Sequence, residues 1–148
     1  RLEPRFLPHF GSAAESVGAA GCGGGMQYVQ LDVLDAGFLG HLRQLVVEVA
    51  RPVALLGMHL CGTLSLRAIE AFAHLDLVRA LALSPCCLPK KDDAGSAHPE
   101  LYASKDSARQ YSAWAAHLEA VLRRNAPGAT VGSRAVADVL SPKNIVIC

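Results

Sequence analysis

Two apolar runs of strand length dominate the middle of the sequence, and each stops abruptly at reactive side chains. VALLGM occupies residues 53–58, and LVRALALS occupies residues 77–84. Continuous apolar runs bounded by turn residues are typical of parallel strands that are buried on both faces. The segment between them, 65–75, has helical periodicity, with Thr63 or Ser65 as its cap. The sequence therefore predicts a strand–helix–strand unit whose two strands lie parallel in one sheet.

The rest of the chain continues this alternation of strands and helices. Residues 26–33, MQYVQLDV, predict a strand, and residues 36–50 predict an amphipathic helix. Residues 106–125 predict the clearest helix, and weaker strands are expected at 129–140 and 145–148 around a turn at 141–144. The apolar stripe of the 106–125 helix comprises Tyr111, Trp114, Ala115, Leu118, Val121 and Leu122. This order predicts an α/β fold with a mainly parallel sheet and an antiparallel C-terminal hairpin.

The length and composition suit one domain in a reducing compartment. The chain has 148 residues, of which 51% are hydrophobic, and a net charge of +1, so its charge gives no argument for a nucleic acid or an acidic membrane surface. Five cysteines, an odd number, without a secretory signal favour an intracellular location, cytoplasmic or nuclear, with upstream organellar targeting left open. No apolar run approaches the ~20 residues that a membrane span needs.

Two segments are expected to be loops. Residues 11–25 are rich in Gly and Ala, and residues 88–104 are long and polar. The glycines of the first segment lead into a predicted strand, whereas a phosphate-binding loop leads into a helix, so we interpret the segment as a flexible loop. Lys90 and Lys91 in the second segment are either solvated surface or a contact for a phosphate.

Chemically versatile side chains follow the predicted strands. Asp32 ends the first strand, His59 and Cys61 follow the second, and Cys86 and Cys87 follow the third. In open α/β sheets ligands bind at the carboxyl ends of the strands, so these residues are expected to crowd one edge. His59 is a candidate acid/base or substrate contact; the alternative is a histidine bonded to backbone beside a cysteine packed as an apolar residue.

The paired cysteines leave two further alternatives open. Because successive residues point in different directions, at most one of Cys86 and Cys87 is expected to face a pocket, and the other to pack in the core. A metal site made of His59, Cys61 and one of these cysteines is also conceivable, although the spacing matches no zinc-finger pattern and no C-x-x-C pair occurs. Our prediction assigns no metal.

Several segments together resemble a known family. GMHLCGTLSLRAIEAF, LALSPCCLP, LSPKNIVIC and QLDVLD are similar to the corresponding parts of a group of S-adenosylmethionine-dependent methyltransferases with a Rossmann-like fold. The group includes tRNA 2′-O-methyltransferases that act at position 4 of the acceptor stem and uncharacterised methyltransferase-like proteins. H-x-C-G followed by P-C-C one strand–helix unit later carries most of the resemblance, which spans most of residues 26–148.

The resemblance implies a fold, a cofactor and site residues. The implied fold is a three-layer α/β/α sandwich. The implied methyl donor is S-adenosylmethionine, and the methyl acceptor is tRNA or another RNA, with a protein or a small molecule as alternatives. The implied cofactor-binding residues are Glu3, Asp32, Val33 and Met58, and the implied catalytic residues are His59, Cys61 and Cys86. Asp32 would bind near the adenine, the alternative being an aspartate that initiates the next helix. Glu3 would accept hydrogen bonds from the ribose, the alternative being a surface charge.

The chain departs from the family at its beginning. No first strand with an acidic, glycine-rich cofactor loop precedes residue 26, so we expect the N-terminal strands of the domain to be missing, with residues 1–3 as the tail of the second. The zinc-binding motifs of the tRNA enzymes are also not found. The competing hypothesis is a catalytically inactive Rossmann-like binding or scaffold module, and a zinc protein is a third.

Overall fold

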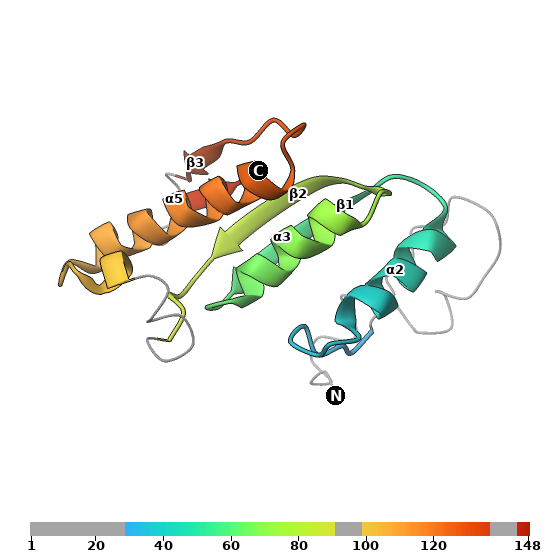
Figure 1. The fold of residues 1–148 in the computed structure, drawn as a ribbon, viewed down its shortest axis with the longest axis horizontal. Helices are drawn as coiled ribbons and strands as arrows, with labels where there is room; N and C mark the ends of the chain where they lie inside the picture. Colours follow the sequence, from blue (N-terminus) through green and yellow to red (C-terminus); the bar gives the residue numbers. More distant parts are fainter. Residues whose placement is uncertain (1–28, 91–98, 137–144) are drawn as a thin grey trace, which may run out of the picture. The chain divides into compact units, whose positions relative to one another are not determined.

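The computed structural model describes residues 29–90, 99–136 and 145–148. The chain divides between Asp32 and Val33, and the fold presented below is that of residues 33–148 (Figure 1). Its elements, in chain order, are α2 (Phe38–Val49), β1 (Val53–Leu60), α3 (Leu64–His74), β2 (Val78–Pro85), the 3₁₀ helix η2 (Pro99–Tyr102), α5 (Ser107–Asn125), β3 (Ser133–Ala135) and β4 (Ile145–Ile147).

The described strands form one mixed sheet in the order β1-β2-β4-β3. β1 and β2 are parallel, as the strand–helix–strand pattern predicts, whereas β4 runs antiparallel to both β2 and β3. The α/β class and the antiparallel C-terminal hairpin are therefore confirmed. The sheet is not mainly parallel in the part of the chain that the structure describes, because the last strand inserts between β2 and β3.

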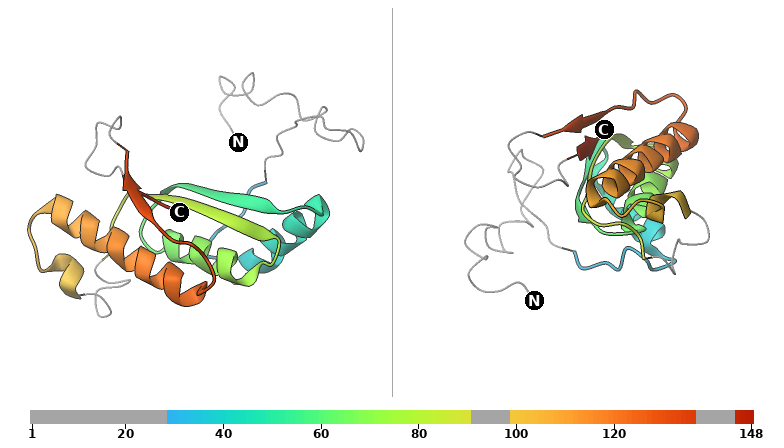
Figure 2. Two further views of the ribbon diagram at one scale, coloured as in Figure 1. Left: turned by 90° about the horizontal axis from the view of Figure 1, so that it is seen from above. Right: turned by 90° about the vertical axis from the view of Figure 1, so that its left-hand side faces the viewer.

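The helices lie on one face of the sheet. Figure 2 shows α3 and α5 side by side beneath the strands, and α2 joins them through Val46, which packs with Ala71 and Leu75 of the α3 region. The opposite face of β1 is open, with Leu56 77% and Met58 68% exposed. The described residues thus form two layers, and the expected three-layer arrangement is not seen in them.

The larger core cluster lies between the helices and the central strands. Trp114, Leu118 and Leu122 of α5 are buried against Leu83 of β2 and Ile147 of β4. α5 is preceded by its N-cap Asp106, whose carboxylate accepts hydrogen bonds from two backbone N–H groups of the first turn, so the helix starts within one residue of the predicted position. The apolar stripe predicted for residues 106–125 is confirmed, because five of its six members are buried.

Two predicted strands differ from the structure. Residues 29–33 form no strand; residues 26–28 lie outside the described part. The run at 53–58 extends to Leu60, and its residues alternate from Val53 to Met58 between half-buried or buried and exposed, so the prediction of burial on both faces is wrong. β1 lies at an edge of the described sheet with no layer over its second face, and an apolar strand in that position buries only the side chains that point toward the helices.

The remaining expectations concern segments that the structure describes in part. Residues 11–25, Glu3 and the turn at 141–144 lie outside the described residues, and the polar loop 88–104 contains η2. None of the helices in the described ranges combines the length and the apolar character that crossing a bilayer requires.

Two leucines on paired strands provide a matched test of this architecture. Leu83 of β2 is fully buried and Leu56 of β1 is 77% exposed. We expect Leu83→Ala to lower the free energy of unfolding by about 2–5 kcal/mol, because it leaves a cavity in the core. Leu56→Ala is expected to change it by no more than about 0.5 kcal/mol. Urea unfolding followed by circular dichroism measures both, and equal losses would mean that the open face of β1 is covered in solution.

Candidate functional site

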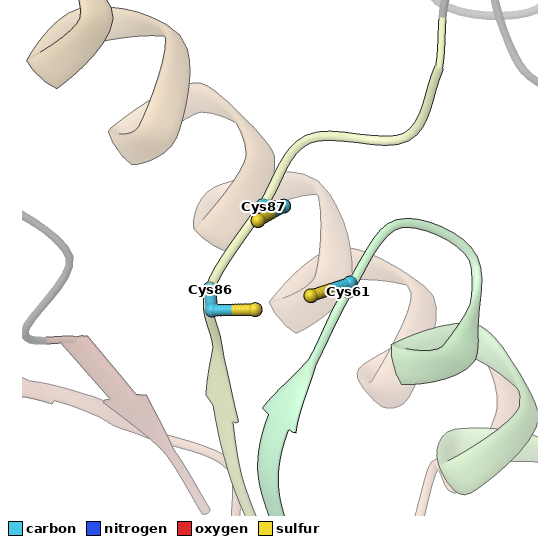
Figure 3. Close-up of side chains that lie close together, drawn as sticks. All are labelled: Cys61, Cys86 and Cys87. Atoms are coloured by element: carbon cyan, nitrogen blue, oxygen red, sulfur yellow. The ribbon is translucent and has the colours of Figure 1, made fainter.

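The parallel pairing of β1 and β2 brings two cysteine-containing segments to the same edge of the sheet. The register pairs Leu60, the last residue of β1, with Pro85, the last residue of β2. Cys61 follows directly after the first strand, and Cys86 and Cys87 follow directly after the second. The three Sγ atoms all lie within 4.8 Å of one another (Figure 3). The edge predicted from the strand ends therefore holds a cluster of three thiol groups.

The cluster is reached from solvent on one side. Cys61 is exposed, whereas Cys86 and Cys87 are half-buried. The prediction that one of the adjacent cysteines packs in the core is wrong, because both sulfur atoms belong to the cluster. Strict alternation ends with β2 at Pro85, so the backbone beyond it is free to turn both side chains toward Cys61.

A glycine joins the two segments. The Gly62 N–H donates a hydrogen bond to the Cys87 carbonyl at 3.2 Å, and Gly62 has a φ of +55°. A Cβ atom at this position would lie 3.4 Å from the Cα atom of Pro89. That distance is an ordinary contact, so it is the left-handed backbone that favours glycine here.

Hydroxyl groups brace the same segments from the helical layer. The buried Tyr111 hydroxyl of α5 donates to the Pro85 carbonyl at 2.7 Å, and the Tyr102 hydroxyl donates to the Pro89 carbonyl. At the end of β1, the Ser65 hydroxyl donates to the Leu60 carbonyl at 3.1 Å. The backbone on each side of the cysteines is thus fixed by bonds to α3, α5 and η2.

His59 occupies an unusual backbone conformation. Its φ is +56°, and it lies at a register shift between Met58 and Leu60, where β1 has one residue more than β2. A left-handed residue other than glycine costs on the order of 1 kcal/mol and is enriched at functional sites. The side chain is exposed. Among the described residues the cluster within 4.8 Å contains the three cysteines alone, so His59 is not part of it.

The thiols influence each other's ionisation. Burial raises the pKa of Cys86 from 9.0 to about 12, and hydrogen bonds and charge repulsion from Cys61 and Cys87 add to this rise. Burial also raises the pKa of Tyr111, whose hydroxyl lies next to this group. In the absence of a positive charge, the structure therefore disfavours a thiolate at Cys86.

The residues assigned to the cofactor are not brought together by the described part of the chain. Val33 lies in a turn beside an apolar hollow between α2, α3 and β1, where its carbonyl accepts a bond from Arg67. Met58 lies on the open face of β1 and does not line that hollow. Asp32 is exposed and belongs to the unit that ends at residue 32, whereas Val33 begins the next unit. Glu3 is outside the described residues. Of the residues assigned to catalysis, Cys61 and Cys86 meet, together with Cys87.

Sequence reasoning did not identify the groups that brace the site. Tyr111 was placed in the apolar stripe of its helix, which is where it lies, but its bond to the Pro85 carbonyl was not foreseen. The sequence does contain a signal for this bond. A buried position in an apolar stripe could be filled by phenylalanine, so a tyrosine there indicates that its hydroxyl has a hydrogen-bond partner.

Comparison of the chain with protein-family models, with curated proteins and with solved structures found no match.

The raised pKa of Cys86 predicts its reactivity toward alkylation. In metal-free folded protein, we expect the rate of Cys86 carboxamidomethylation to rise with a midpoint near pH 12, against about 9.0 in urea-unfolded protein. Because folding raises the pKa, the neutral thiol favours the folded state fully below pH 9.0, and this contribution is lost as the pH rises toward 12. Cys61→Ala should lower the folded midpoint by removing a neighbouring thiol. Peptide mass spectrometry measures each rate, and identical folded and unfolded midpoints would contradict the prediction.

Proposed function

We propose that this chain is part of a Rossmann-like, S-adenosylmethionine-dependent methyltransferase. The observation that carries the proposal is the meeting of the H-x-C-G and P-C-C segments at the carboxyl ends of two adjacent parallel strands. This edge is where open α/β sheets bind ligands. The strand order β1-β2-β4-β3, with an antiparallel last strand inserted beside β2, supports the same assignment because it agrees with the antiparallel finish that the resemblance implies.

The described residues allow a proposal for how the methyl acceptor would be bound, but not for how the cofactor would be bound. Val33 and Met58 do not line a common hollow, so we assign no geometry to the bound cofactor. When bound, S-adenosylmethionine would supply the methyl group. His59, exposed at the strand end, would orient an acceptor hydroxyl or amine and accept its proton, and Cys61 and Cys86 would form the adjoining wall.

The methyl acceptor proposed from the resemblance is RNA, with tRNA as the first candidate to test. The net charge of +1 offers no independent argument for RNA over a protein or a small molecule. Function is decided by the site and not by the fold, so the three acceptor classes belong in one screen.

One observation favours a second function, a cofactor-free binding module. The open face of β1 exposes the apolar side chains of Leu56 and Met58, and exposed apolar patches often mark protein interaction sites. This alternative requires no catalytic residue, and it predicts that His59, Cys61 and Cys86 are dispensable for the function of the chain.

Calorimetric titration of S-adenosylhomocysteine distinguishes the two proposals. The titration is performed on this 148-residue chain and on the longest chain that the gene encodes. We expect micromolar binding by the longer chain and weak or no binding by the shorter one, because the resemblance places the glycine-rich cofactor loop before the matched segments. A failure of both chains to bind would favour the binding module.

His59 can be tested with two substitutions that separate its imidazole from its backbone. His59→Ala removes both the imidazole and any preference for the left-handed conformation, whereas His59→Gly removes the imidazole but accepts a φ of +56° without strain. We expect both variants to lower kcat for methyl transfer by about 10²–10⁴-fold, the usual size of an acid–base contribution.

The two His59 variants should differ only in stability. His59→Gly is expected to unfold at a urea concentration no lower than that of the parent protein, since it relieves the strained backbone. Unchanged methyl transfer in a folded His59→Gly variant would refute the proton-accepting function of this residue.

A further inference from the structure

The three thiols at the edge of the sheet come from two separate strand ends. Cys61 follows β1, and Cys86, which follows β2 together with Cys87, lies 25 residues after Cys61 (86 − 61), so no short sequence motif unites them. Their Sγ atoms nevertheless lie within 4.8 Å of one another (Figure 3). Three sulfur ligands converging on one small volume form a candidate coordination site.

The spacing agrees with the geometry of a metal–thiolate centre. Zinc–sulfur bonds are about 2.3 Å long, which places the sulfur atoms of a tetrahedral site about 3.8 Å apart. Sulfur atoms already within 4.8 Å of one another need only small side-chain rotations to reach that separation. The three ligands therefore do not require a rearrangement of the backbone.

The backbone that carries these ligands is held in place by several bonds. Gly62 N–H binds the Cys87 carbonyl and thereby links the two loops directly. The buried Tyr111 hydroxyl binds the Pro85 carbonyl, one residue before Cys86, and the Tyr102 hydroxyl binds the Pro89 carbonyl, two residues after Cys87. Ligands held by such outer bonds bind a metal with less loss of conformational freedom.

The ligand type and the exposure of the cluster define the ion that would bind. Thiolates select thiophilic ions such as Zn²⁺, whereas Mg²⁺ and Ca²⁺ prefer oxygen ligands. Within the described part of the chain, no carboxylate or imidazole belongs to the cluster. Cys61 is exposed, so an ion can enter from solvent, and a fourth coordination position would face the water.

We propose that Cys61, Cys86 and Cys87 form a binding site for one zinc-like cation, with a solvent molecule as the fourth ligand. Each thiol loses its proton to solvent as its sulfur–metal bond forms, so binding one ion releases up to three protons. The proposal goes beyond methyl transfer and rests on the cysteine geometry alone. It stands whether or not the chain binds S-adenosylmethionine.

Metal titration of the 148-residue chain tests the site. Reduced, chelator-treated protein is titrated with Zn²⁺ in competition with a chromophoric chelator, and with Co²⁺ to detect sulfur-to-metal charge-transfer absorption. We expect one equivalent of either ion to bind, Co²⁺ to give sulfur-to-metal charge-transfer bands, and Mg²⁺ not to compete. Cys61→Ser, Cys86→Ser and Cys87→Ser should each weaken Zn²⁺ binding by more than about tenfold, since loss of a ligand exceeds loss of an outer partner.

Cys148→Ser is the matched control, because Cys148 is an exposed thiol that does not belong to the cluster. This variant should retain the affinity, the stoichiometry and the charge-transfer absorption of the parent chain. Cys61 is also exposed, so Cys61→Ser is expected to fold, as judged by circular dichroism, and it carries the test even if a substitution at Cys86 or Cys87 does not fold. The absence of tight binding by the reduced parent chain, or unchanged affinity in folded Cys61→Ser, would overturn the proposal.

Discussion

The parallel pairing of β1 with β2 is the constraint on which the rest of the structure depends. It aligns the ends of the two strands, and it sets Gly57 opposite Leu83 at the point where the strands meet the helical layer. A Cβ atom at Gly57 would approach Leu60 too closely and would lie 2.8 Å from the Cδ2 atom of Leu83. The absence of a side chain at one position therefore lets two leucines fill the core, and the cysteine cluster follows from the same register.

The cysteine cluster and the hydrophobic core are connected through the helix α5. α5 buries Trp114 and Leu118 against the sheet, and on the same helix Tyr111 reaches the carbonyl of Pro85 beside the cysteines. A change that shifts α5 along the sheet would move this hydroxyl and the loop that carries Cys86. The position of the thiols is thus determined partly by residues that are far from them in the sequence, and mutations in the core are expected to affect the site.

The features that could be predicted from the sequence are those that depend on local pattern. α5 was predictable because its N-cap, apolar stripe and terminal arginines all lie within one segment. The segment around Val29 has strand-like composition but forms no strand in the described residues, because composition does not provide a pairing partner. Leu56 is exposed because no described layer covers its face of β1, and Cys86 and Cys87 lie together beside Cys61, which follows another strand. Both features depend on segments distant in the sequence, so local pattern does not predict them.

The extra residue at His59 also determines which side chains follow it on each face of β1. Gly57 and Leu60 both face the helical layer although they are three positions apart, an odd number that a regular two-residue alternation forbids. The bulge shifts the phase of the strand by one residue just before it ends. Deletion of His59 would therefore restore the regular alternation and leave Leu60 opposite Pro85, on the helical face. The bulge thus adds one exposed residue at the end of β1 without changing which residues of β1 pair with Ser84 and Pro85.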